Sequence, residues 1–146
     1  VLCSKLFPAW YIGRNPEHEI LTVSHSDQLS SDFGRSVRDI VNTEEFSRIF
    51  RGVSLRSDVR AAGKWKTNQN GTYYAAGVRS QIAGRGAHVA ILDDAMSEEE
   101  IERFQKEMEV HTDKKVLPIS SVTGRNIDFL KNLMLKTKIQ NTNEDK

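Results

Sequence analysis

The chain has 146 residues, of which 38% are hydrophobic and 28% charged, and its formal net charge at pH 7 is +1. This length suits one ordinary domain, and the balanced charge does not indicate a nucleic acid or a membrane surface as partner. The single cysteine, Cys3, excludes an internal disulfide framework and a cysteine-built metal site, and the sequence has neither a membrane span nor a secretory signal, so we expect a cytoplasmic protein without membrane contact.

The first predicted elements are a helix end and a buried strand. Residues 7–16 combine aromatic side chains with turn formers, which indicates the end of a helix followed by a packed connection. Residues 19–26 have the β-branched content and the length of a buried strand, with small polar residues at its carboxyl end. His25 in that segment is either a ligand contact or, more commonly for a lone histidine, an ordinary loop or core residue.

Two helices are predicted next. Between Asp27 and Asn42 the apolar residues recur at spacings of three and four, and Ser26 or Asp27 can cap the first turn. Thr43 is the N-cap of a short helix that should run through Phe50. The arginines of these helices are expected on solvated faces: Arg35, Arg38 and Arg48.

Residues 53–79 change to a β-rich character between helical segments. Short strands are predicted at residues 53–56 and 64–67. The Asn-Gln-Asn-Gly sequence at 68–71 is a hairpin turn signal that leads into a further strand at 72–78. The sequence therefore predicts a β-hairpin insertion.

The run His-Val-Ala-Ile-Leu-Asp-Asp at residues 88–94 is the segment around which the rest is organised. It predicts a strand buried on both faces, whose acids share a sheet edge with the polar end of the strand at 19–26. This is the outline of a Walker B strand, in which the first acid, Asp93, holds Mg²⁺ and the adjacent Asp94 polarises the attacking water. A buried strand that only runs into an Asp-rich turn gives the same pattern.

A Gly-Arg-Gly loop precedes this strand. Gly84 and Gly86 allow the backbone to approach a ligand closely, and they leave the guanidinium of Arg85 free to project. The alternative is a turn that carries a surface arginine.

The carboxyl-terminal third is predicted to contain two helices and a strand. Ser97 caps the first helix, residues 114–120 form a short strand, and Asn126 caps the last helix. The apolar residues of that last helix are expected to face inward: Ile127, Leu130, Leu133 and Met134. Residues 140–146 form a polar tail that we expect to be disordered.

A series of pieces occurs in the order found in a known family: Phe-Pro-Ala-Trp-Tyr-Ile-Gly-Arg-Asn-Pro (7–16), Val-Ser-His-Ser (23–26), Asp-Phe-Gly-Arg-Ser-Val-Arg-Asp (32–39), Glu-Glu-Phe-Ser-Arg-Ile-Phe-Arg-Gly-Val (44–53), Gly-Thr-Tyr-Tyr-Ala-Ala-Gly-Val (71–78) and Ile-Ala-Gly-Arg-Gly-Ala-His-Val-Ala-Ile-Leu-Asp-Asp (82–94). Through these pieces residues 6–94 resemble the ATPase domain of the large terminase subunit of tailed bacteriophages. The resemblance implies a motor that hydrolyses ATP with Mg²⁺ and drives viral DNA into a preformed capsid.

The resemblance also implies residue roles and a fold. Asp93 would be the Mg²⁺ ligand and Asp94 the catalytic acid, although many such ATPases have Glu at the second position. Arg85, or alternatively Arg79, would be a finger that reaches the ATP of a neighbouring subunit. The implied fold is α/β, three-layered, with a mostly parallel sheet of the P-loop NTPase type. Implied partners are double-stranded DNA, the portal and the small terminase subunit, within a homo-oligomeric ring of the intact protein in the bacterial host cytoplasm.

The sequence departs from that family in its phosphate-binding loop. None of the 146 residues forms a Gly-rich loop ending in Lys-Ser or Lys-Thr, and no nuclease domain is present. Without those backbone N–H groups and that lysine, a triphosphate has almost nothing to hold it. We therefore expect residues 1–94 to be a partial ATPase domain, and the isolated chain to bind neither ATP nor GTP and to be inactive alone.

Two later pieces are Asp-Ala-Met-Ser-Glu-Glu-Glu-Ile (94–101) and Thr-Asp-Lys-Lys-Val-Leu-Pro-Ile-Ser-Ser-Val-Thr-Gly (112–124). They resemble the end of the GTPase domain of Obg-type proteins, although the Asn-Lys half of its guanine-reading motif is absent. Residues 95–139 would then be an Obg-like terminal strand and helix, which implies a join of two unrelated pieces near Asp94. A non-catalytic remnant or binding module, and a piece of an Obg-type GTP-binding protein, are the alternative functions.

Overall fold

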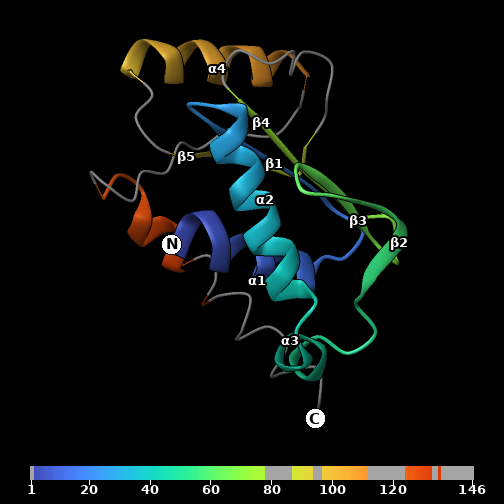
Figure 1. The fold of residues 1–146 in the computed structure, drawn as a ribbon. Coiled ribbons are helices and arrows are strands. Elements are labelled where there is room, and N and C mark those ends of the chain that lie inside the picture. The colour runs from blue at the N-terminus through green and yellow to red at the C-terminus, as the bar shows by residue number, and fades with distance from the viewer. Residues whose placement is uncertain (1, 78–86, 94–96, 112–123, 133–134, 136–146) are drawn as a thin grey trace.

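The computed structural model describes residues 2–77, 87–93, 97–111, 124–132 and 135, and the elements below lie within them (Figure 1). In chain order they are a π-helix η1 (Leu2–Leu6), α1 (Phe7–Arg14), β1 (Glu19–Ser24), α2 (Asp27–Val41), α3 (Glu44–Ile49), β2 (Leu55–Ala61), β3 (Lys64–Thr67), β4 (Thr72–Gly77), β5 (Val89–Asp93) and α4 (Glu98–His111). Residues 127–132 are also helical. The predicted α/β class is confirmed.

The five strands form one mixed sheet in the order β2-β3-β4-β1-β5. The central strand β1 is parallel to β4 and to β5, whereas β3 is antiparallel to both of its neighbours. We expected a mostly parallel sheet, and among the described strands two of the four pairings are parallel. The reason is the short turn on each side of β3, because a parallel connection needs a long crossover such as the one through α2.

The predicted hairpin turn joins β3 to β4. Thr67 N donates to Gly71 O over 2.9 Å, and Asn70 adopts a positive φ of 70° that asparagine tolerates. Gly71 lies against Pro16, where an added Cβ would be 2.2 Å from the Pro16 carbonyl oxygen. The hairpin is not a separate insertion, since β4 lies inside the sheet between β3 and β1. The strand expected at residues 53–56 is instead β2.

Side-chain caps define the start of α2 and of α3. Ser26 Oγ accepts from Leu29 N, and Thr43 Oγ1 accepts from Phe46 N, each over 3.2 Å. Such caps satisfy N–H groups that have no partner within the helix. Helix α2 lies across the sheet, packed against β4 and β1 (Figure 1). Its residue Val37 is buried in the main hydrophobic cluster.

The centre of the core is an aromatic stack between β3 and β4. The rings of Trp65 and Tyr73 are fully buried, with centroids 5.0 Å apart and planes at 2°. Trp65 Nε1 donates to Gly34 O of α2 over 3.1 Å. Gly34 lies so close to the β2–β3 turn that an added Cβ would be 2.3 Å from Ala62 O. Buried side chains of η1, α1, β1, α2, α3 and β5 belong to the same cluster, together with Val53 and Leu130.

The opposite face of the sheet has a smaller cluster. Its buried members are Leu21, Val23 and Ala76, with Ala90 and Leu92 packed against them. Strand β1, predicted as a buried strand, is therefore buried on both faces. Burial on both faces was predicted for β5, but β5 is an outer strand of the sheet among the described residues, and its Val89, Ala90 and Leu92 are only partly buried. The helices with extensive contacts to the sheet, α2 and η1, lie on the first face, so a third layer stays a prediction.

Three expectations fall outside the described residues: the strand at 114–120, the inward-facing Leu133 and Met134, and the tail at 140–146. The last helix is present at residues 127–132, and its Leu130 is buried as predicted. No helix among the residues that the structure describes has the length and hydropathy needed to cross a membrane.

Candidate functional site

Three parallel strands end side by side at one edge of the sheet. Gly77 of β4, Ser24 of β1 and Asp93 of β5 are register partners at that edge. Open α/β sheets bind ligands at the carboxyl ends of their strands. The expected sharing of one edge by Asp93 and the polar end of β1 is therefore confirmed, and this edge is the candidate site.

A buried serine pair connects this edge to α2. Ser24 Oγ lies 2.7 Å from Ser30 Oγ, and Ser30 Oγ donates to Ala76 O over 2.6 Å. Because the single proton of Ser30 is used on Ala76, Ser24 must be the donor between the two hydroxyls. The carbonyl of Ser26, at 3.1 Å from Ser24 Oγ, is the weaker competing acceptor. Ser24 is thus held as a structural tie between β1, α2 and β4 and is not free to act as a nucleophile.

Asp27 closes the loop after β1 against the end of β4. Its Oδ1 accepts from Gly77 N over 2.6 Å, and an added Cβ at Gly77 would meet that oxygen at 2.8 Å. Asp27 also lies in the first turn of α2, where a negative charge is favourable. The sequence shows Asp27 only as a possible cap, since its partner is 50 residues away.

His25 lies exposed in the turn between β1 and α2. Within the described part of the chain it makes no hydrogen bond and no ion pair, so its surroundings are those of an ordinary loop histidine.

The predicted catalytic residues are only partly placed. Asp93 is the last residue of β5, directly beside Ser24. Asp94, Arg85 and Arg79 lie outside the described residues. Within the residues described, no group of three or more His, Cys, Asp or Glu side chains is assembled for a metal ion.

An imidazole stack lies at the opposite edge of the sheet, at the amino ends of β1 and β5. The rings of His18 and His88 have centroids 4.0 Å apart and planes at 15°. His18 Nδ1 lies 2.9 Å from the Tyr11 hydroxyl, and His88 Nδ1 accepts from Glu19 N over 3.1 Å. Burial raises the pKa of the Tyr11 hydroxyl. These contacts tie α1 to the start of both strands, a structural role that sequence spacing does not reveal.

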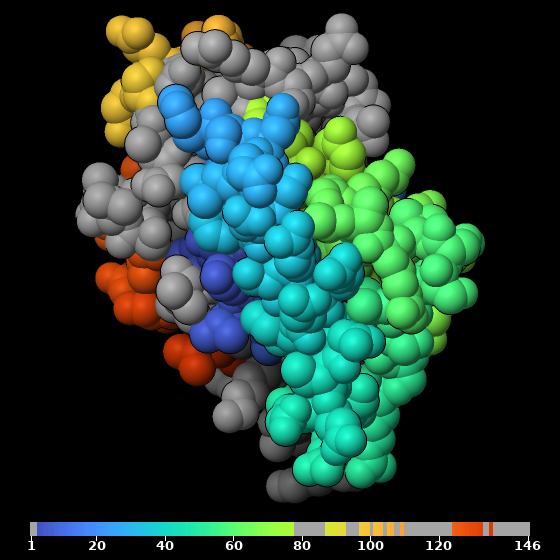
Figure 2. All heavy atoms as spheres, in the orientation of Figure 1, coloured from blue at the N-terminus to red at the C-terminus, as the bar shows by residue number. Residues whose placement is uncertain are grey.

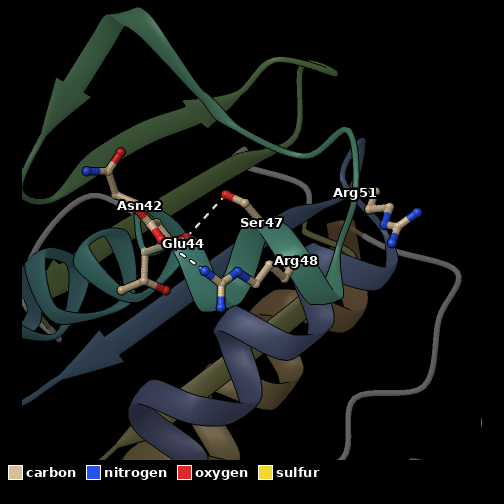
Figure 3. A pocket seen from close by; sticks show the side chains of 6 residues that line it. Asn42, Glu44, Ser47, Arg48 and Arg51 are labelled. Atoms are coloured by element: carbon tan, nitrogen blue, oxygen red, sulfur yellow. Dashed lines mark hydrogen bonds and ion pairs between the residues drawn. The ribbon is translucent and has the colours of Figure 1, made fainter.

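An open depression of about 450 Å³ lies beside α3 (Figure 3). Its lining residues are Asn42, Thr43, Glu44, Ser47, Arg48 and Arg51. The Arg48–Glu44 pair within it, at 3.2 Å, is solvent-exposed and adds little stability. The depression is at the far end of the 15-residue helix α2, about 22 Å from the carboxyl edge of β1 by helix length. It is therefore separate from the candidate site.

Comparisons with known proteins identify no relative of this chain. No protein family, no curated protein and no solved structure matches this chain.

Proposed function

We propose that this chain contains the Walker B part of the ATPase of a tailed-phage terminase large subunit. The observation that supports this most strongly is the position of Asp93, at the carboxyl end of a strand parallel to β1 and beside Ser24. An acid at this edge is where a Mg²⁺-nucleotide site requires one. The order of the family-like pieces from residue 6 to residue 94 supports the same proposal.

The residues present suit a magnesium ion better than a triphosphate. Mg²⁺ is bound by carboxylate oxygens and keeps several waters, so Asp93 would hold it directly or through a water. Asp94 would polarise the attacking water, and Arg85 or Arg79 would stabilise charge on the transferring phosphoryl group. The chain has no Gly-rich loop with Lys-Ser or Lys-Thr, so we propose that it does not hold ATP by itself.

The residues around Asp93 would hold the proposed metal ligand in position. The Ser24–Ser30 pair and the Asp27–Gly77 bond fix the ends of β1 and β4 relative to α2. A metal ligand is effective only when neighbouring groups hold it in place. The proposed partners in the intact protein are double-stranded DNA, the portal and the small terminase subunit, in a homo-oligomeric ring in the bacterial host cytoplasm.

Calorimetric titration of the purified chain with Mg²⁺-ATP and with Mg²⁺-GTP tests the proposal that the chain does not hold a nucleotide by itself. We expect no binding at micromolar affinity, and tight binding of either nucleotide would contradict the account. A fusion of the chain to the phosphate-loop segment of a tailed-phage terminase tests the proposed catalytic role of Asp94. In that fusion Asp94→Asn should abolish hydrolysis but keep ATP binding, whereas Asp58→Asn on the distant strand β2 should change neither.

The result of the fusion also separates the competing functions. A folded fusion that binds ATP and hydrolyses it equally well with Asp94→Asn would contradict the proposed role of that acid. A folded fusion that binds ATP without hydrolysis would favour the non-catalytic remnant. Preferential binding of GTP would favour the piece of an Obg-type protein.

A further inference from the structure

Strand β2 is an outer strand of the sheet among the described residues, and it forms a border of the molecule in Figures 1 and 2. An outer strand presents backbone N–H and C=O groups that can pair with a strand of another molecule. What occupies the outer side of β2 therefore determines whether two copies can join there.

Two arginines occupy carbonyl groups along β2. Arg38 Nη1, from α2, donates to Arg60 O over 2.8 Å. Arg60 Nε donates to Arg56 O over 2.8 Å, and Arg60 Nη2 donates to Leu55 O over 3.4 Å. Three carbonyls of this seven-residue strand thus accept from guanidinium groups.

The pairing with β3 shows which of these carbonyls point outward. Ala61 pairs with Lys64 across the two-residue turn, and carbonyl directions alternate along a strand, so the carbonyl of Arg60 points away from β3. At the other end Ser54 O accepts from Asn68 N, so the next carbonyl, that of Leu55, also points away from β3. The register is irregular between Leu55 and Arg60. Two of the three carbonyls that accept from guanidinium groups, those of Arg60 and Leu55, therefore point to the side where a second strand would have to pair.

The two arginines are held in place by their own neighbours. The Arg38 side chain is only 25% exposed, and its Nη2 lies 3.3 Å from Asp39 Oδ1, so it is less solvated than the expected solvated helix face implies. Arg60 uses the planar fork of its guanidinium to reach two carbonyls, which an ammonium group cannot reproduce with the same geometry. Arg56 has a different task, because it bonds Asp58 and the hairpin residue Asn70.

We propose that Arg38 and Arg60 form an edge guard that keeps β2 from pairing with a strand of a second copy of this chain. The guard acts in two ways. Its hydrogen bonds occupy acceptors that an incoming strand needs, and its positive charges on this edge repel the same edge of another copy. This inference is independent of the proposed ATPase function.

The test compares two double variants with the same change of charge. Arg38→Ala/Arg60→Ala removes the guard, and the control Arg35→Ala/Arg48→Ala removes two exposed helix arginines. Sedimentation velocity over a wide concentration range should show self-association about tenfold tighter or more for the guard variant than for the parent chain. The control should behave like the parent.

Hydrogen exchange then locates the contact. In the associated guard variant the amides of β2 should become more protected as concentration rises, while those of α2 should stay unchanged. Association without protection of β2 would overturn the proposal, and so would unchanged sedimentation of a guard variant whose circular dichroism is that of the parent.

A milder variant covers the case in which the double variant does not fold. Arg60→Lys keeps the charge but loses the fork that reaches two carbonyls. We expect it to associate more tightly than the parent and less tightly than the double variant. Sedimentation of Arg60→Lys identical to that of the parent would overturn the role of the hydrogen bonds.

Discussion

Ser24 and Asp93 are direct register partners at the carboxyl ends of the parallel strands β1 and β5. Ser24 is fully buried and its hydroxyl is used by Ser30, so it fixes the position of the strand end beside the acid. The arrangement gives Asp93 a rigid neighbour at the edge where α/β sheets bind ligands. The proposed metal role of Asp93 depends on this relationship.

Ile91 tests whether β5 is a core strand. It is 8% exposed and packs in the main hydrophobic cluster, so Ile91→Asp should place an unpaired charge in the core. We expect a loss of about 3 kcal/mol or more in the free energy of unfolding, or no folded protein. Thermal and urea unfolding measure it, with Ser57→Asp on the exposed part of β2 as control. An unchanged melting temperature would show that β5 is not in the core.

The Ser30 hydroxyl links β1 and β4 to α2. Ser30→Ala would leave the Ala76 carbonyl and the Ser24 hydroxyl without their buried partner. The expected cost is about 1–3 kcal/mol in the free energy of unfolding, the range for a buried group left unsatisfied. Ser36→Ala on the exposed side of the same helix is the matched control and should cost less. Equal urea midpoints for the two variants would contradict the structural tie.

The Tyr11 hydroxyl gives a test at high pH. Its pKa is raised by burial from the ordinary value of 10.0, so the folded chain holds this proton at pH values where the unfolded chain has released it. Stability should therefore fall as pH rises above about 10. Tyr11→Phe should show a smaller fall than the parent chain when unfolding is followed by circular dichroism. An equally steep fall in Tyr11→Phe would show that other groups cause it.

Local patterns in the sequence predict most of the individual elements. The boundaries of β3, the start of α2 with its Ser26 cap, and the hairpin turn before β4 all follow from residue type and spacing. These features depend on neighbours within a few residues. The predicted end of β5 at an acid follows from the same kind of pattern.

Contacts between distant segments were not predictable. The place of β4 between β3 and β1, the stack of His18 with His88 and the Asp27–Gly77 bond join residues far apart in the chain. No periodicity indicates such pairs, because the tertiary arrangement alone brings them together. Arg38 is a further example. Its position on α2 predicts a solvated side chain, but the carbonyl group to which it donates lies on β2.

Binding of Mn²⁺ in place of Mg²⁺ tests the central claim most directly. Bound Mn²⁺ broadens the amide signals of nearby residues in nuclear magnetic resonance spectra, even when binding is weak. We predict that the amides of Ser24 and Gly77 broaden first in the parent chain, that Asp93→Asn removes this effect, and that Asp27→Asn keeps it, because asparagine retains the oxygen that accepts from Gly77 N. The same broadening in Asp93→Asn, or broadening that begins elsewhere in the chain, would contradict the account.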